Sequence, residues 1–336
     1  MLEKPDLADD RMAACLWEAY DVQAAQVVFL PLGADENTAV YRITTPDATP
    51  YFLKLRSGIF DETSVLLPKF LSEQGIRQII PPVATKTGQL WADLGGFKTI
   101  LYPFIHGQNG YERPLTDEHW RTLGATLRQI HTAVLPPHLA SHIRQETFSP
   151  QWRDVVRQVL AEWVTAVYAD PIARDCAAFL QSKRAHIADL TARAEELAEK
   201  LRAEMPAFTV CHADIHAGNV LISDEAFYVV DWDTLLFAPK ERDLMFAGAG
   251  LFGHDRSPAE EETLFYQGYG QTEIDYTAVA YYRHERIIED IAIYCQQLLL
   301  THEGGEDRAQ SLTYLKSNFL SGSTIEIADH TLASRS

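Results

Sequence analysis

The chain has 336 residues, of which 46% are hydrophobic and 23% are charged, and these values exclude a disordered or collagen-like protein. Its length predicts two domains or lobes. Aspartate and glutamate outnumber lysine and arginine by 47 to 29, which gives a net charge of −18. An acidic surface repels phosphate backbones and anionic lipids, so we expect neither a nucleic-acid nor a membrane partner.

The four cysteines are far apart and form no CxxC pair, which is typical of a reducing compartment. The first ten residues are acidic and contain no apolar stretch of the kind that a secretory signal needs. No apolar run reaches the length of a membrane span. We therefore expect a cytoplasmic protein.

The first third of the chain predicts a small, mostly antiparallel sheet with one helix. Strand patterns separated by glycine and proline occupy residues 27–30, 38–43 and 51–55. Residues 61–74 have the apolar spacing of a helix, although Pro68 interrupts it. Weaker strand patterns follow at 79–83, 89–91 and 98–102.

Beyond residue 107 the chain becomes mainly helical. Thr116 is the expected cap of a helix with apolar residues at helical spacing, and two long helices are predicted near 151–168 and 172–203. A short β region at 208–211, 220–223 and 227–231 precedes a further helical stretch from 240 to 318. The change of character at 103–107 is the expected boundary between the two parts.

The chemically informative segment reads HADIHAGN over residues 212–219 and is followed by two strand patterns and then DWD at 231–233. Pairing of the two strands as a hairpin would bring Asn219 beside Asp231. An amide oxygen and a carboxylate form the hard-oxygen site that Mg²⁺ prefers. Asp214 lies five residues earlier on the same loop, where its carboxylate is placed to orient a hydroxyl.

This layout matches the needs of phosphoryl transfer, which also requires a cation on the remaining phosphates. Lys54 lies in an apolar strand, where a lysine is costly unless it meets an anion. Glu62 at the start of the following helix is the expected partner of Lys54, and Glu73 is a second candidate. Two simpler interpretations stay open. Lys54 could be an edge-strand lysine whose ammonium reaches water, and Glu62 could be a first-turn acid that interacts favourably with the helix dipole.

The pattern of His212, Asp214, Asn219 and Asp231 resembles the kinase-like aminoglycoside and small-molecule phosphotransferases. Further similar stretches are YFLK at 51–54, YPFIH at 102–106, APKERDLM at 238–245 and YYRHERIIEDIA at 281–292, and the later ones point to the spectinomycin branch. The resemblance implies an α+β, bilobal protein-kinase-like fold that binds ATP and Mg²⁺ between its lobes. The implied lobes are residues 1–102 and 108–336, joined by a hinge at 103–107.

The resemblance also implies a role for each matching residue. The implied roles are catalytic base for Asp214, Mg²⁺ ligands for Asn219 and Asp231, phosphate binding for Lys54, adenine binding by the backbone of Pro103 and Ile105, and a phosphate-covering turn at 32–37 that contains Gly33. Protein kinases have a repeated-glycine loop and a long activation segment, and the chain has neither. A small-molecule substrate is therefore expected.

The expected activity is phosphorylation of a hydroxyl on a small cationic aminocyclitol, with spectinomycin as the expected substrate. The region from 106 to 336 holds 34 acidic against 20 basic residues, which would attract amines. Candidate substrate contacts are Asp233, Glu289 and Asp290. Glu289 and Asp290 lie on a late helix with Arg283 and Arg286, where a structural salt-bridge network is the other interpretation. Arg242 and Asp243 are expected to form a buried ion pair that braces the catalytic loop.

Three other interpretations remain open from the sequence. The substrate of the kinase could be choline, homoserine or a thio-sugar. The chain could be a nucleotide-binding regulator without activity. Metal-dependent hydrolysis through His212 and His216 is the third, although histidine suits zinc better than magnesium.

Overall fold

The structure is a computed structural model that describes residues 4–32, 37–253, 256–301 and 305–333. The chain packs as two units. Unit 1 consists of Met1–Arg113, Ala133–Ile143 and Ala217–Leu235, and unit 2 of Pro114–Thr132, Arg144–His216 and Leu236–Ser336. The lobe boundaries inferred from the sequence stay a prediction, and each unit is described by itself.

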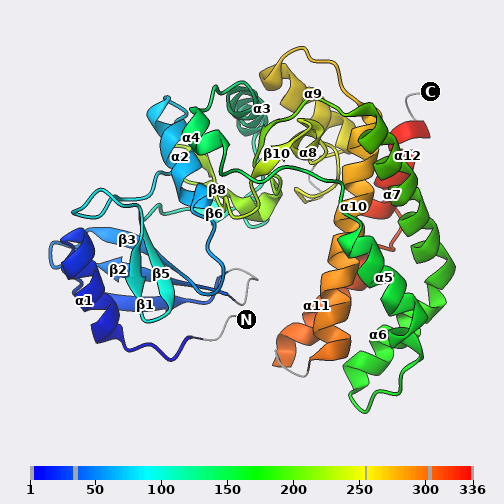
Figure 1. The fold of residues 1–336 in the computed structure, drawn as a ribbon, viewed down its shortest axis with the longest axis horizontal. Helices are drawn as coiled ribbons and strands as arrows, with labels where there is room; N and C mark the ends of the chain where they lie inside the picture. Colours follow the sequence, from blue (N-terminus) through cyan, green and yellow to red (C-terminus); the bar gives the residue numbers. More distant parts are fainter. Residues whose placement is uncertain (1–3, 33–36, 254–255, 302–304, 334–336) are drawn as a thin grey trace. The chain divides into compact units, whose positions relative to one another are not determined.

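Unit 1 is built on an antiparallel sheet of five strands with the order β1-β2-β3-β5-β4. The strands are β1 (Gln26–Leu30), β2 (Thr38–Thr44), β3 (Pro50–Arg56), β4 (Ala92–Leu94) and β5 (Phe97–Pro103). Helix α1 (Asp9–Tyr20) lies against the sheet (Figure 1). Met12 and Leu16 of α1 share an apolar core with Tyr41 and Leu53 of the sheet. The sheet therefore has one buried face on which its strands are anchored.

Most of the predicted elements of this unit are confirmed, with two differences. The strand patterns at 27–30, 38–43, 51–55 and 98–102 correspond to β1, β2, β3 and β5, and the helix is α2 (Thr63–Glu73) with Pro68 inside it. The pattern at 89–91 is not a strand, because β4 begins only at Ala92. The pattern at 79–83 forms a single bridge, between Ile79 and Val229.

A hairpin of β8 (Val220–Ile222) and β9 (Phe227–Val229) confirms the predicted pairing, with Val220 opposite Val229. Strand β6 (Gln108–Asn109) adds to β8, and the backbone N–H of Val229 donates to Gln78 at 2.8 Å. These bonds join the hairpin to the rest of unit 1. The short helices η2 (Ala217–Asn219) and α4 (Pro137–Ala140) belong to the same unit.

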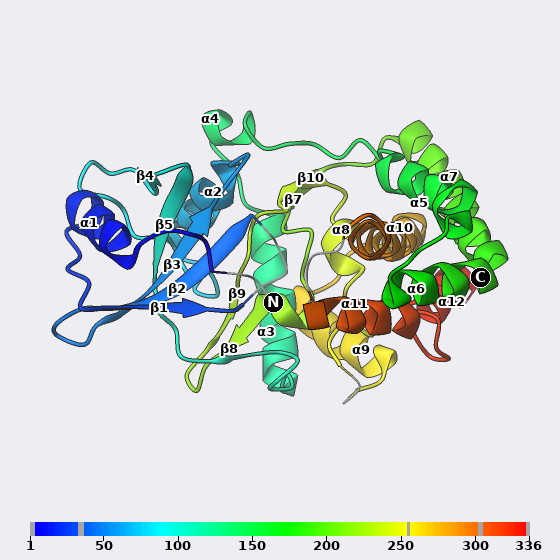
Figure 2. The same ribbon diagram turned by 90° about the horizontal axis from the view of Figure 1, so that it is seen from below.

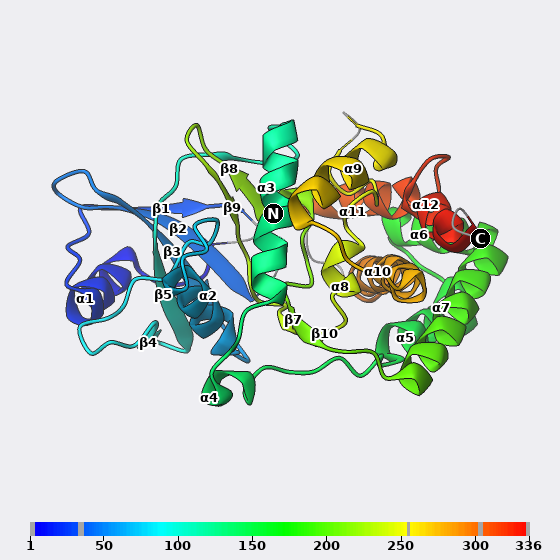
Figure 3. The ribbon, with the colours of Figure 1, turned by 90° about the horizontal axis from the view of Figure 1, so that it is seen from above.

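Unit 2 is organised around helix α10 (Tyr276–Cys295), most of whose residues are buried. The helices packed on α10 are α5 (Gln151–Ala161), α7 (Arg184–Glu204), α8 (Glu241–Leu244), α11 (Gly305–Ser317) and α12 (Thr324–Ala333). Figures 2 and 3 view α10 end-on with these helices around it. Strand β7 (Thr209–Cys211) pairs with β10 (Leu236–Ala238), and α10 continues as the π-helical turn η3 (Gln296–Leu300).

Two further helices of unit 2 pack unusually closely. Helix α3 (Asp117–His131) begins at the predicted cap, where the hydroxyl of Thr116 accepts from the N–H of His119 at 3.2 Å. Helix α9 (Pro258–Tyr269) crosses α3 at Gly124 and Gly268, where an added Cβ would lie 2.1 and 1.7 Å from backbone oxygens of the opposite helix. Only glycine permits this approach.

The two long helices predicted between 151 and 203 are wrong in their extent. Helix α5 ends at Ala161 and is followed by the 3-10 turn η1 (Trp163–Thr165). The second prediction is divided into α6 (Pro171–Ser182) and α7, because Lys183 has a non-helical ψ of 5°. Apolar periodicity continues across the break, so the pattern alone did not reveal it. Among the described helices, none combines the length and apolar character needed to cross a membrane.

Candidate active site

Lys54 lies in β3, the central strand of the five-stranded sheet, opposite Val40 of β2 and Ile100 of β5. A central position excludes the interpretation of Lys54 as an edge-strand lysine. Its Nζ donates to Oδ1 of Asp231 at 3.1 Å and to Oδ2 of Asp233 at 2.9 Å. The sheet therefore presents one ammonium group to two carboxylates of unit 1.

The charge of Lys54 is stabilised by these carboxylates. Burial by itself would lower the pKa of Lys54, but the charges of Asp231 and Asp233 outweigh burial and raise the pKa. Asp233 also accepts from Nη1 of Arg56 at 3.3 Å. Asp233 thus lies between two cations, and Lys54 stays protonated throughout the neutral range.

The open end of the hairpin carries Asn219 on one strand and Asp231 on the other. The N–H of Val230 donates to the backbone oxygen of Asn219 at 3.0 Å, which extends the strand register by one step and places Asp231 next in line. Asn219 is buried, and Asp231 has the left-handed φ of 65° that aspartate tolerates better than most residues. An amide oxygen and a carboxylate at this point fit the hard-oxygen preference of Mg²⁺.

The other predicted nucleotide contacts are less defined. Glu62 is the exposed N-cap of α2, whereas the side chain of Asp61 accepts the N–H of Thr63 at 2.9 Å, and the pairing of Glu62 with Lys54 stays a prediction. Pro103 ends β5. Ile105 follows two residues later and is half-buried. Gly33 lies outside the described residues.

Asp214 belongs to unit 2, and its carboxylate forms an ion pair with Arg286 of α10. The second oxygen, Oδ2, lies 3.6 Å from Nε2 of His216, and the backbone N–H of Asp214 donates to Nδ1 of His212 at 3.3 Å. Burial by itself would raise the pKa of Asp214. The contact with His216 and the guanidinium of Arg286 outweigh burial and hold the pKa well below its usual range. Asp214 is therefore an ionised carboxylate at neutral pH.

The loop that carries Asp214 is tethered by the fully buried side chain of Asp243. Its Oδ1 accepts from the N–H of Ala213 at 2.6 Å, and its Oδ2 accepts from the N–H of His212 at 3.0 Å. These bonds hold Ala213 at a φ of 72°, a left-handed conformation that is unfavourable for alanine. Asp243 thus fixes the backbone immediately before the catalytic candidate.

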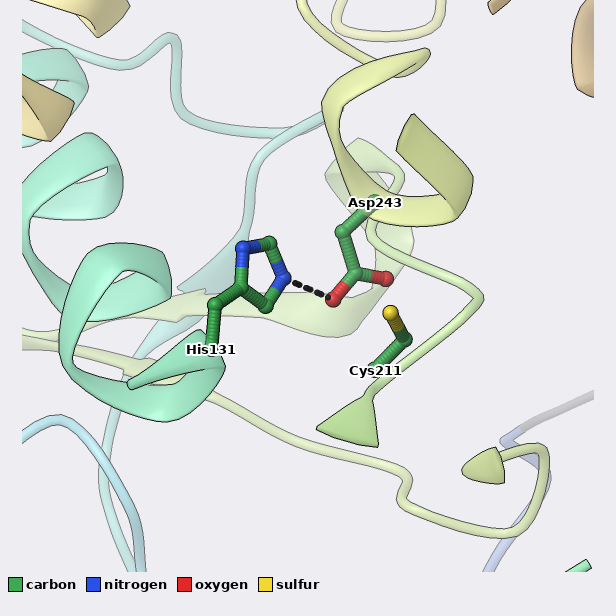
Figure 4. A group of neighbouring side chains, drawn as sticks. All are labelled: His131, Cys211 and Asp243. Atoms are coloured by element: carbon green, nitrogen blue, oxygen red, sulfur yellow. Dashed lines mark hydrogen bonds and ion pairs between the residues drawn. The ribbon is translucent and has the colours of Figure 1, made fainter. Parts of the chain in front are cut away.

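The predicted bracing by Asp243 is present, but the predicted ion pair with Arg242 is wrong. No described ion pair joins these two residues; the partner of Asp243 is His131 of α3, whose Nε2 lies 3.0 Å from Oδ2 (Figure 4). The guanidinium of Arg242 lies 5.2 Å from the ring centre of Tyr282 instead. Neighbours in sequence point to different sides of α8, which explains the error.

Cys211 lies beside His131 and Asp243 in the same buried cluster (Figure 4). Burial raises the pKa of the Cys211 thiol well above its usual value, and the thiol lies 3.6 Å from the carbonyl of Pro239. Nδ1 of His131 bonds to the hydroxyl of Tyr269 at 2.8 Å. The donors and acceptors of this cluster thus serve one another and the loop backbone.

The two candidate substrate contacts of α10 have different surroundings. Asp290 lies 3.3 Å from Nε of Arg286 on the same helix. Burial by itself would lower the pKa of Arg242, but charges led by that of Glu289 raise it. Arg286 itself was missed by the reasoning from sequence as a partner of Asp214. The available signal was a run of charged side chains on a helix whose other residues are apolar.

The model of the phosphotransferase enzyme family matches residues 28–282 of the chain. The solved structure of spectinomycin phosphotransferase APH(9)-Ia in complex with ADP and spectinomycin superposes with a TM-score of 0.90, at 36% identity over 98% of this chain and 99% of that one. Its AMP-bound complex gives a TM-score of 0.85, at 35% identity over 97% of this chain and 99% of that one.

A curated relative, protein StrN of Streptomyces griseus, is 27% identical over 239 residues, which cover 66% of this chain and 69% of the relative. Together, these similarities confirm the kinase-like fold and the class of enzyme that the sequence predicts, an ATP-dependent phosphotransferase. The chain belongs to the phosphotransferase enzyme family.

Proposed function

We propose that the protein transfers the terminal phosphoryl group of Mg²⁺-ATP to a hydroxyl of a small cationic aminocyclitol, with spectinomycin as the substrate. The observation that carries the proposal is the similarity along nearly the whole chain to a phosphotransferase that was solved with ADP and spectinomycin. The ionised Asp214 and the pairing of Lys54 with Asp231 supply the chemistry that this reaction needs.

In the proposed reaction, the oxygen of the substrate hydroxyl forms a bond to the terminal phosphorus while the bond from that phosphorus to the leaving ADP oxygen breaks. Asp214 orients the hydroxyl and accepts its proton as the new bond forms. The low pKa of Asp214 favours alignment with late proton transfer over early deprotonation. Lys54 binds the non-transferred phosphates, whose charge its ammonium balances.

Asn219 and Asp231 would hold Mg²⁺, which when bound neutralises phosphate oxygens. Lys54 lies 3.1 Å from Asp231, so the same carboxylate connects the cation of the sheet to the metal candidate. Asp233 holds Lys54 and Arg56 in place. We therefore assign Asp233 to positioning of the phosphate-binding cations and not to the substrate.

Glu289 is the best of the three acidic candidates for a substrate amine. Asp233 pairs with Lys54, and Asp290 lies 3.3 Å from Arg286. By contrast, no ion pair among the described residues includes Glu289, which is half-buried on α10. A cationic substrate amine would gain most from a carboxylate that forms no direct ion pair, although the charges of Arg242 and Arg286 also act on Glu289.

The direct test is mass spectrometry of spectinomycin after incubation with the protein and Mg²⁺-ATP. One added phosphoryl group is the expected product, and the Asp214→Asn variant should form none while it still binds ATP in a titration. Choline, homoserine and a thio-sugar in the same assay test the other substrates. Phosphorylation of one of these but not of spectinomycin would reassign the substrate, and ATP binding without any turnover would indicate a regulator.

A further inference from the structure

One arginine of unit 2 contacts the catalytic candidate directly. Arg286 lies near the middle of α10, and its Nη1 donates to Oδ1 of Asp214. Its Nε lies 3.3 Å from Oδ1 of Asp290, an ion-pair contact without a hydrogen bond. The side chains of Asp214 and Arg286 are 20% and 22% exposed, so the pair is largely sheltered from water but reachable by a ligand. Nothing in the proposed chemistry has yet used this guanidinium.

We propose that Arg286 is a positioning residue for Asp214 and that Asp290 holds Arg286 in the required orientation. The inference rests on the proposed function, in which Asp214 aligns the acceptor hydroxyl. The guanidinium holds Oδ1, and Oδ2 has the longer contact, 3.6 Å to His216.

The geometry of this support is set by a rigid element. Arg286 is flanked on α10 by Ile287 and Ile288, which are 3% and 0% exposed and pack in the core of unit 2. Asp290 lies one helical turn further on, the spacing at which side chains of a helix meet. A catalytic group held from a packed helix keeps its orientation better than one held only by its own loop.

Arginine suits this role better than lysine. Its planar guanidinium has donors on different edges, so that it can contact Asp214 and Asp290 at the same time. The Arg286→Lys substitution would place a point charge there, without hydrogen-bond donors in fixed directions. It should therefore preserve the charge near Asp214 but only part of the alignment.

The charge of Arg286 has a second consequence. The groups that act on Asp214 are His212 and His216 on its own loop and Arg286 and Asp290 on α10. Without the guanidinium, the remaining carboxylate of Asp290 would raise the pKa of Asp214. The acidic limb of the pH–rate profile should then move to higher pH, a change that loss of packing alone would not produce.

The test compares Arg286→Met and Arg286→Lys with the native protein, with Arg193→Met on the exposed face of α7 as a control. We expect Arg286→Met to lower kcat by roughly 100-fold with little change in the KM for ATP, and its acidic limb to move up. Arg286→Lys should restore the acidic limb and part of kcat. Guanidinium ion at non-denaturing concentration should partly rescue Arg286→Ala, and thermal melts verify folding.

The same pH profile can be recorded for slow hydrolysis of ATP by water, without any antibiotic. Absence of spectinomycin phosphorylation would therefore overturn the proposed substrate but leave the role of Arg286 testable. A folded Arg286→Met variant with native kcat would overturn the positioning role. The same holds if Arg286→Met has a lowered kcat but an unmoved acidic limb and guanidinium does not rescue Arg286→Ala. Faster turnover in this variant would show that Arg286 blocks Asp214, which would also overturn it.

Discussion

Substitution of Asp243 by asparagine changes the tether of the catalytic loop by a single atom. In the native protein, Oδ1 accepts one hydrogen bond, from Ala213, while Oδ2 accepts from His212 and faces His131. An amide has only one oxygen, which we expect to take the place of Oδ2 because that atom has two partners. The new NH₂ group then faces the N–H of Ala213, and that bond is lost.

The magnitude follows from burial. The side chain of Asp243 is 0% exposed, so the N–H of Ala213 is left without a partner in the interior. Loss of one charge-assisted bond together with the desolvated donor costs about 3 kcal/mol. For a unit of this size, the melting temperature should fall by roughly 6 to 12 °C. Asp243→Ala, which removes all three partners, should cost about 5 kcal/mol.

Catalysis should suffer as well, because Ala213 is held in a left-handed conformation next to Asp214. Without its bond to Asp243, the loop can relax, and a displacement of the catalytic carboxylate by ~1 Å lowers the rate by about 100-fold. The KM for ATP should change little. Thermal melts and steady-state kinetics of Asp243→Asn measure both effects.

Asp224→Asn, at a side chain that is 97% exposed, is the matched control and should stay within about 0.5 kcal/mol of the native protein. The pH dependence gives a further check. Burial by itself raises the pKa of Asp243, but the hydrogen bond and charge of His131 and the N–H of Ala213 lower it more. Its contribution is therefore present above the unfolded pKa of about 3.9 and is lost as the pH falls through the lower folded value.

The difference in stability between the native protein and Asp243→Asn should consequently be about 3 kcal/mol at neutral pH and shrink below about pH 4. Thermal melts of both proteins at pH values from below 4 to neutrality measure this stability difference. An Asp243→Asn protein that melts and turns over like the native one would refute the tethering role. A stability difference that grows as the pH falls below about 4 would refute the sign of the pKa shift of Asp243.

Three other substitutions test the site and its support. Lys54→Met should weaken ATP binding in a titration at least tenfold, because the phosphates lose their cation, and unchanged binding would contradict that role. Asp214→Asn should reduce kcat by 100-fold or more with ATP affinity kept, and a parallel loss of both would count against it as the base. Gly268→Ala places a Cβ 1.7 Å from the backbone oxygen of Arg121, so it should destabilise the protein by about 3 kcal/mol in a melt, whereas a native melting temperature would show that α3 and α9 can separate freely.

Local sequence patterns were sufficient to predict many of the strands of unit 1. Alternating apolar residues with glycine and proline between them predicted the main strands, and the spacing of two short runs predicted the β8–β9 hairpin that brings Asn219 to the end of β9. Such features depend on neighbours in the sequence. The break between α6 and α7 at Lys183 was missed because apolar periodicity continues through it.

The sequence by itself determined the family, and it predicted which groups carry the chemistry, Lys54 in an apolar strand and Asp214 in its loop. Only the tertiary structure decided how these groups are held. Lys54 pairs with Asp231, 177 positions away in the sequence, and Asp214 pairs with Arg286, 72 positions away. Residue types and spacings express local preferences of the backbone. Pairings across such separations depend on which helix faces and strand ends packing brings together, and no local pattern contains that information.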